Sequence, residues 1–215
     1  MRLPALLCAV GLVTAFVPSV GAQASLPARS FEPSLPSVAP LAAPPVVEWW
    51  REGGPRIRPT DRRVAALLAM GRERSALLRR LVDAVEGADV IVYVGMNPVI
   101  QRGLAGCLTF VSDAGRYRYL RAMLNPDLPT EQIIAALAHE LHHVTEIIAH
   151  PEVRSESALA ALYRGIGTEN RRAVQSGWET NAAQRAGWDV RRELKEHAAA
   201  ATIARRQAGE NAGGR

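Results

Sequence analysis

The chain has 215 residues, a formal net charge of +5 and two cysteines. Its length suits one domain with a hydrophobic core together with terminal extensions. The arginines are scattered among Asp and Glu, aromatic residues make up only 5% of the chain, and no nucleic-acid motif is present. We therefore expect a solvated basic surface and no nucleic-acid partner.

The first 24 residues have the pattern of an export signal. Arg2 supplies the positive charge, residues 3–17 are mostly apolar, and residues 22–24 form a small-x-small cleavage site. The apolar run is too short to span a bilayer comfortably. We expect cleavage near Ala24 and an exported protein, secreted or periplasmic, with no stable membrane span. An uncleaved N-terminal anchor is the alternative.

The two cysteines limit the covalent and metal chemistry of the exported chain. Cleavage of the signal removes Cys8 and leaves Cys107, so the mature chain can form no internal disulfide. Cys107 lies in an apolar run, which favours burial. Any zinc site must then use histidine and carboxylate ligands.

Composition divides the rest of the chain into three parts. Residues 25–59 are rich in proline, which opposes helix formation and strand pairing. We expect a disordered linker there, or a pro-segment that is removed. Residues 60–206 are predicted to form the folded domain, and the polar, glycine-rich residues 207–215 a disordered tail.

Helices are predicted where apolar residues recur with helical spacing. Thr60 can cap the first helix, and Pro151 stops the second. The predicted helices cover residues 60–85, 130–150, 151–163 and 179–206.

Strands are predicted in the segment between the first two helices. Residues 89–94 are β-branched and short, which predicts a buried strand. Residues 104–111 and 116–124 predict two further strands, joined as a hairpin by the turn at residues 112–115. The expected fold class is α+β, with a small antiparallel sheet or hairpin packed on a predominantly helical domain.

Residues 139–143 read His-Glu-Leu-His-His and contain the pattern H-E-x-x-H. Residues four apart lie on one face of a helix, with roughly 5–6 Å between their Cβ atoms, so His139 and His143 can bind one zinc ion. Glu140, one step round the helix, can take a proton from the water that zinc activates. His142 points elsewhere and is expected to be a surface histidine.

A strand hairpin followed by a helix with His-Glu-x-x-His resembles the zincin metallopeptidases, over roughly residues 89–190. The resemblance implies a zincin-like fold, zinc as cofactor and hydrolysis of a peptide or protein substrate. It implies Glu140 as the general base, which later gives its proton to the leaving amine. In that superfamily the strand before the helix commonly lies along the cleft, which implies residues 117–123 as the edge that pairs with extended substrate.

A catalytic zinc usually has three protein ligands and one open position. The metzincin branch continues with Gly and His where this chain has Glu146 and Ala149, so the chain departs from that branch. The gluzincin branch supplies a Glu from a later helix. Glu179 is the expected third ligand, because it heads an Ala-rich stripe of the last predicted helix that faces other protein, where a carboxylate needs a partner. If no metal binds, Glu179 would simply be an acid at a helix N-terminus, where the helix dipole favours it. Glu146, Glu156 and Glu169 are the alternative third ligands.

Glu146 is expected to act on an imidazole rather than on the metal. Positions 139 and 146 are about 10 Å apart along the helix axis, too far for both to reach one ion easily. Glu146 can instead accept the second N–H of a ligand histidine, or pair with an arginine on the surface. A residue that stabilises the oxyanion should also exist, and the candidates are Tyr163, His197 and Tyr119.

The sequence supports an exported zinc metallopeptidase best, and two other functions stay open. One is a non-catalytic exported helical binding domain in which the motif arose by chance. The other is a structural domain stabilised by zinc in a closed site. Tightly bound zinc would exclude the first alternative, and an exchangeable water on the zinc would argue against the second.

Overall fold

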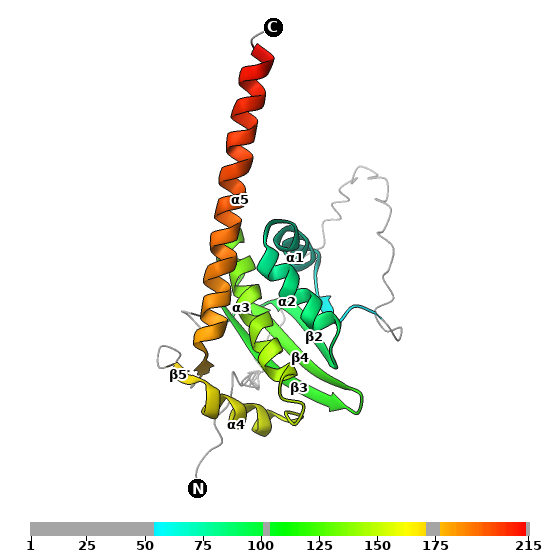
Figure 1. Ribbon diagram of the computed structural model, residues 1–215. Helices are drawn as coiled ribbons and strands as arrows, with labels where there is room; N and C mark the ends of the chain where they lie inside the picture. The colour runs from blue at the N-terminus through cyan, green and yellow to red at the C-terminus, as the bar shows by residue number, and fades with distance from the viewer. Residues whose placement is uncertain (1–53, 101–103, 171–176, 214–215) are drawn as a thin grey trace, which may run out of the picture.

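The fold is α+β, as the sequence predicts, with five helices, a four-stranded mixed sheet and a two-stranded sheet (Figure 1). The computed structural model describes residues 54–100, 104–170 and 177–213. The predicted signal at residues 1–24 and most of the predicted linker lie outside the described residues. No helix among the residues described has the length and apolarity needed to cross a bilayer.

The larger sheet has the strand order β1-β2-β4-β3. β1 and β4 both run parallel to β2, and β3 runs antiparallel to β4. The predicted hairpin is confirmed, but the sheet is mixed rather than antiparallel. The strands are β1 (Ile57–Pro59), β2 (Val90–Met96), β3 (Gly106–Ala114) and β4 (Tyr117–Leu124).

β4 lies inside the sheet, so the expectation that residues 117–123 form a substrate-binding edge is wrong. Its backbone is hydrogen-bonded to β2 on one side and to β3 on the other, which leaves no free ladder for another strand. The edge strand on this side of the sheet is β3. An extended peptide could therefore add to the sheet at β3, not at β4.

The helices are α1 (Arg62–Arg74), α2 (Ala76–Glu86), α3 (Thr130–Ile148), α4 (Glu156–Ile166) and α5 (Asn181–Gly213). The single helix predicted over residues 60–85 is wrong, because it breaks at Ser75. Ser75 has an extended backbone, with φ −131° and ψ 120°, and its side chain accepts a hydrogen bond from the Leu78 N–H at the start of α2. Asp61 caps α1 in the same way, in place of the predicted Thr60.

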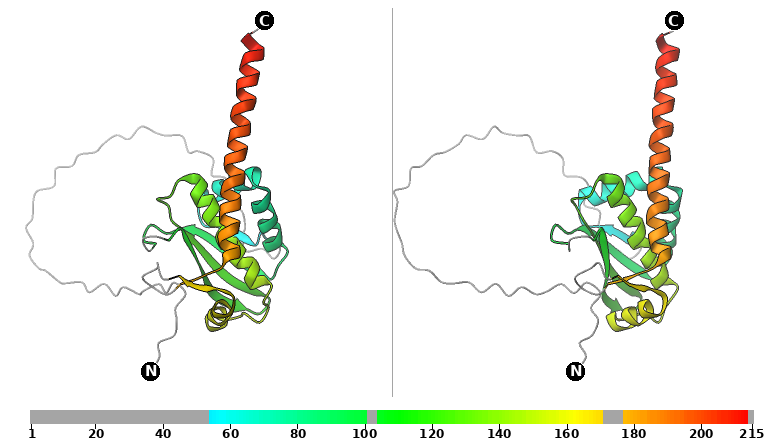
Figure 2. Two further views of the ribbon diagram at one scale, coloured as in Figure 1. Left: turned by 60° about the vertical axis from the view of Figure 1, so that its left-hand side comes forward. Right: turned by 90° about the vertical axis from the view of Figure 1, so that its left-hand side faces the viewer.

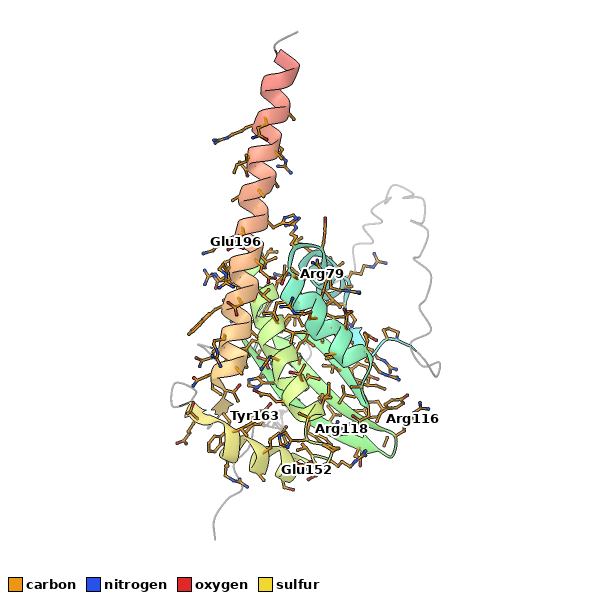
Figure 3. All side chains as sticks on the ribbon, viewed as in Figure 1. Arg79, Arg116, Arg118, Glu152, Tyr163 and Glu196 are labelled. Carbon is orange, nitrogen blue, oxygen red and sulfur yellow. The ribbon has the colours of Figure 1, made fainter. Side chains whose placement is uncertain are left out.

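One face of the sheet is covered by α1, α2 and α3, and the hydrophobic core lies between these two layers (Figure 2). α3 is the central helix, since it packs against the sheet on one side and against α2 and α5 on others. Its C-terminal end is fixed by the fully buried Arg118 of β4, which donates to the carbonyl oxygens of Ile147 at 2.7 Å and His150 at 2.9 Å and pairs with Asp89 (Figure 3). The His-Glu-x-x-His motif is thus on a helix that is held by the sheet, by α2 and by α5.

α5 runs antiparallel to α3 and packs closely against it. A Cβ on Gly187 would lie 3.2 Å from the carbonyl oxygen of Ala135, so glycine at this position allows the two backbones to approach. The stripe predicted to face other protein is buried, at Ala183, Ala186, Val190 and Leu194. Beyond this contact α5 projects away from the domain (Figures 1 and 2).

The predicted boundaries of the domain are wrong at both ends. Residues 57–59, placed in the disordered linker, form β1 and pair with β2. Residues 207–213, placed in the disordered tail, continue α5. Alanines and arginines dominate residues 198–206, and these residue types favour helix strongly enough to extend it without tertiary contacts.

Candidate metal centre

His139 and His143 lie on α3, and Glu179 faces them from the last residue of β6. The second, two-stranded sheet pairs β5 (Thr168–Asn170) with β6 (Gly177–Glu179) and leads into α5. Glu179 is therefore in a strand, two residues before α5, and the prediction that it opens the helix is wrong. The structure nevertheless brings the three predicted ligands together, with one ligand atom of each residue within 4.8 Å of the others.

The distances within this cluster suit one small cation. Glu179 Oε1 lies 3.2 Å from His139 Nε2 and 3.4 Å from His143 Nε2. Zn–N and Zn–O bonds of roughly 2.1 Å in a tetrahedral arrangement place ligand atoms about 3.4 Å apart. Two imidazole nitrogens and one carboxylate oxygen are also a donor set that zinc accepts, with a fourth position left over. The residues present thus fit zinc chemically, and the two distances to Glu179 match the tetrahedral spacing.

A second layer of hydrogen bonds holds His143 from behind. His143 Nδ1 lies 2.7 Å from Glu146 Oε2, and Thr180 Oγ1 donates to Glu146 Oε1 at 2.6 Å. Thr180 also accepts from the Ala183 N–H at 3.1 Å, so the hydroxyl that anchors Glu146 is at the same time the N-terminal cap of α5. With Nδ1 bonded to Glu146, Nε2 of His143 is directed towards His139 and Glu179. Glu146 thus contacts an imidazole, in the position predicted for it.

The charges of the cluster hold it together without a metal. Burial by itself would lower the pKa of His143, but hydrogen bonds to Glu146 and Glu179 raise it from 6.5 to about 10. Burial opposes ionisation of Glu179 as well, yet its hydrogen bonds to His139 and His143 lower its pKa from 4.5 to about 2. The same balance, with Glu179 as the main partner, raises the pKa of His139. The Glu179 carboxylate thus favours the protonated form of both imidazoles.

Glu140 lies on the other side of the two histidines, against the first residue of β3. Its side chain is buried, with 3% of the residue exposed. A Cβ on Gly106 would lie 2.6 Å from Glu140 Oε1, so the absence of a side chain at Gly106 makes room for the carboxylate. Burial raises the pKa of Glu140, against the lowering effect of His139 and His143.

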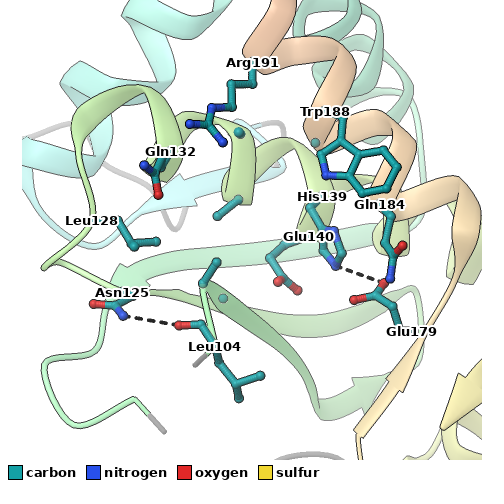
Figure 4. Close-up of a pocket in the computed structure, with 15 residues that line it drawn as sticks. Leu104, Asn125, Leu128, Gln132, His139, Glu140, Glu179, Gln184, Trp188 and Arg191 are labelled. Carbon is teal, nitrogen blue, oxygen red and sulfur yellow. Dashed lines mark hydrogen bonds and ion pairs between the residues drawn. The ribbon is translucent and has the colours of Figure 1, made fainter. Parts of the chain in front are cut away.

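A pocket of about 570 Å³ opens beside Glu140 (Figure 4). His139, Glu140 and Glu179 line one end of it, and residues 104–106, which lead into β3, close one side together with the loop after β4. The remaining walls come from α3 and α5. The pocket thus gives the candidate centre access to a ligand the size of several amino-acid residues.

Sequence reasoning missed several residues that line this pocket. An isolated glycine in a strand, as at Gly106, often marks a close approach of another group and was available as a signal. One face of α5 carries Gln184, Trp188 and Arg191 at spacings of four and three. This pattern in the sequence gains meaning only once that face is known to be a wall of the pocket.

The other predicted site residues lie elsewhere. Glu156 and Glu169 are exposed on α4 and β5 and are not part of the cluster of possible ligands. His142 is half-buried rather than on the surface, with Nε2 3.7 Å from Glu146 Oε1. None of the three candidates for the oxyanion lines the pocket. His197 is exposed far along α5, Tyr119 lies within β4, and Tyr163 is buried behind His143, where its hydroxyl donates to the His143 carbonyl oxygen at 3.3 Å (Figure 3).

Comparisons of this chain with protein-family models, with curated proteins and with solved structures find no significant match.

Proposed function

We propose that the protein is an exported zinc-dependent metallopeptidase of gluzincin type. The observation that carries the proposal is the meeting of His139, His143 and Glu179, from helix α3 and strand β6, beside the buried carboxylate of Glu140 at the end of a pocket. Glu179 is 36 residues beyond His143 in the chain, so its arrival at the two imidazoles depends on the whole fold and not on the local motif.

Each residue of the centre has a distinct role in this proposal. His139, His143 and Glu179 would hold the zinc, which when bound polarises the scissile carbonyl and lowers the pKa of water. Glu140 accepts the proton of the attacking water and later delivers it to the leaving amine. Its raised pKa suits both directions of transfer, because a general base works best when its pKa is near the working pH.

β3 offers the edge along which a substrate would lie. It is the outermost strand next to the centre, and its first residue contacts Glu140. An extended peptide that adds to β3 as another strand would bring its backbone past Gly106 and past the proposed zinc site. The substrate class is thus an extended peptide or an unfolded protein segment.

The pocket favours catalysis over a closed structural zinc site. A structural zinc is normally enclosed by four protein ligands, whereas here three candidate ligands are available and two of them, His139 and Glu179, line an open pocket. An exposed fourth position is what a reacting water needs.

Metal analysis combined with a cleavage assay tests the proposal. The wild-type protein should bind one zinc per chain and cleave members of a mixed peptide library, with products identified by mass spectrometry. His139→Ala and Glu179→Ala should lose both properties. Glu156→Ala, which removes an exposed acid of α4 that was an alternative ligand, should keep both.

Three other outcomes decide against parts of the proposal. Wild-type protein without zinc would refute the metal centre. Full zinc in Glu179→Ala would remove Glu179 from the ligand set. Stoichiometric zinc without any cleavage across the library would favour the closed structural alternative.

A further inference from the structure

The pocket changes character between its two ends. Near the candidate metal centre its walls carry the acids Glu140 and Glu179, whereas at the far end, among the residues that the structure describes, Arg191 is the charged side chain that lines it. Figure 4 shows the Arg191 guanidinium next to the Gln132 amide at this far end, and the Trp188 ring farther along α5, on the side of Gln184. The far end is therefore suited to a negatively charged ligand group.

Arg191 has its hydrogen-bond donors available. Among the residues described, no ion pair or side-chain hydrogen bond involves Arg191, although acids lie close to it in sequence. Asp189 pairs with Arg192 at 2.7 Å, and Glu196 lies 3.7 Å from the same guanidinium. Arg191 thus presents a planar set of donors to the pocket, in the geometry that binds a carboxylate through two parallel bonds.

Trp188 gives the same end of the pocket an apolar surface. It is 67% exposed, which is unusual for so large an apolar side chain, and it lines the pocket one helical turn before Arg191. An indole with a free face next to a guanidinium can pack against the backbone or side chain of a peptide whose carboxylate the guanidinium binds. Trp188 and Arg191 together form one binding surface at the far end.

The distance from this surface to the centre can be expressed in substrate residues. Gln132 and His139 are seven residues apart on α3, and Gln184 and Arg191 are seven apart on α5, so each pair spans about 10 Å along its helix. An extended peptide advances roughly 3.3 Å per residue. A group bound by Arg191 would then be about three residues from a group at the metal centre.

We propose that Arg191 is a specificity-determining residue that binds a carboxylate of the substrate about three residues from the scissile bond, with Trp188 packed beside it. The placement of the scissile bond rests on the proposed function. The carboxylate is either the side chain of an Asp or Glu in the peptide or the peptide's C-terminal carboxylate, since both offer the same two oxygens.

Matched peptides test this proposal on the zinc-loaded wild type, Arg191→Gln and Arg191→Glu. One series moves a single Glu, or Gln as its neutral match, along an otherwise uncharged peptide, and a second series compares a free C-terminus with an amide. We expect wild-type kcat/KM to be about tenfold higher for the peptide with the correctly placed carboxylate, as one charge-assisted contact at a partly exposed site would give. Arg191→Gln should abolish this preference, and Arg191→Glu should reverse it in favour of a Lys at the same position. The series that shows the effect identifies the source of the carboxylate.

Arg192→Gln is the control, because Arg192 is the next residue, carries the same charge and does not line the pocket. It should keep the wild-type preference. Equal rates for Glu and Gln peptides in the wild type, or a preference that survives in Arg191→Glu, would overturn the proposal. If no peptide is cleaved, the proposed function fails. The affinity of the same variants for the peptides, measured by fluorescence anisotropy, then tests the role of Arg191 separately. Carboxylate-dependent binding lost in Arg191→Gln supports the role of Arg191, and its absence in the wild type refutes it.

Discussion

The two sides of the histidine pair on α3 are built in opposite ways. On the pocket side Glu140 is buried against Gly106, and burial raises its pKa. On the rear side Glu146 is bonded to His143 and Thr180, and these hydrogen bonds lower its pKa in spite of partial burial. Two glutamates six residues apart on one helix are thus prepared for different tasks. Burial favours the protonated form of the first, and hydrogen bonds to His143 and Thr180 favour the charged form of the second.

Glu140→Gln should have the largest effect on the rate of hydrolysis. It removes the proposed general base, which lines the pocket but is not a proposed zinc ligand. We expect kcat/KM to fall by about 10² to 10⁴-fold, the range for loss of a general acid–base group. Zinc content should stay at the wild-type level, since the ligand set is intact. Peptide hydrolysis and metal analysis of the same preparation check this.

A matched control separates this effect from a change of helix stability. Glu131→Gln makes the same substitution on an exposed residue in the first turn of α3 and should leave the rate within about twofold of wild type, because surface substitutions away from a site change little. A Glu140→Gln enzyme that hydrolyses at the wild-type rate would show that the pocket side has no proton-transfer role.

Glu146→Gln should weaken metal binding rather than abolish the chemistry. The neutral amide binds the Nδ1–H of His143 less strongly and no longer supplies charge, and loss of such an outer contact typically costs about 10–100-fold in metal affinity. Competition with a chromophoric chelator measures the zinc affinity. Glu152→Gln, a change at an exposed acid beyond α3, serves as the control. Unchanged zinc affinity in Glu146→Gln would mean that the rear side only supports the fold.

Gly106→Ala should lower the rate of hydrolysis through Glu140 alone, and by a smaller factor than Glu140→Gln. The new methyl would lie 2.6 Å from Glu140 Oε1, so the carboxylate must move, which a flexible side chain does at little cost in stability. We expect kcat/KM to fall about tenfold through misplacement of the base, with zinc content unchanged. Gly165→Ala, where a methyl meets no atom within 4 Å, should keep the wild-type rate. A wild-type rate in Gly106→Ala would show that the rate does not depend on the position of Glu140.

The difference between the two sides also explains which parts of the site could be predicted. Periodicity located α3, the hairpin and the pair His139 and His143, because these depend on neighbours in the chain. The role of Gly106 depends on which strand lies under Glu140, and local patterns contain no strand order. The free edge expected on β4 is implied by the resemblance to the zincins, and it is wrong because β2 pairs with β4 from a distant segment.

Capping explains the other errors. Ser75 and Thr180 are each polar residues inside segments predicted as continuous, and each begins a new helix by accepting a backbone N–H. The helix start predicted at Glu179 is thus two residues too early, since α5 begins at Asn181. Glu179 still reaches the histidines, because β6 and the cap at Thr180 direct it towards α3. Its place beside the two histidines thus comes from β6 and not from a helical stripe.

The pH dependence of stability should distinguish the metal-free protein from the zinc-bound one. The pKa of His143 is raised from 6.5 to about 10, so its contribution is fully present below pH 6.5 and is lost as the pH rises through 10. The pKa of Glu179 is lowered from 4.5 to about 2, so its contribution is fully present above pH 4.5 and is lost as the pH falls through 2. The shared network therefore stabilises the metal-free protein most between pH 4.5 and 6.5.

With zinc the dependence should reverse above pH 6.5, because zinc must displace the protons of His139 and His143 and its affinity rises as they become easier to remove. Thermal unfolding with chelator should give a Tm that declines from pH 6.5 towards 10, and the increase in Tm caused by added zinc should grow over the same range. Glu179→Gln should weaken the dependence without zinc, because it removes the carboxylate that both histidines face, while Glu146 still raises the pKa of His143. A metal-free Tm that rises across this range would contradict a protonated pair held by Glu179, and the two sides of α3 would then need a different electrostatic account.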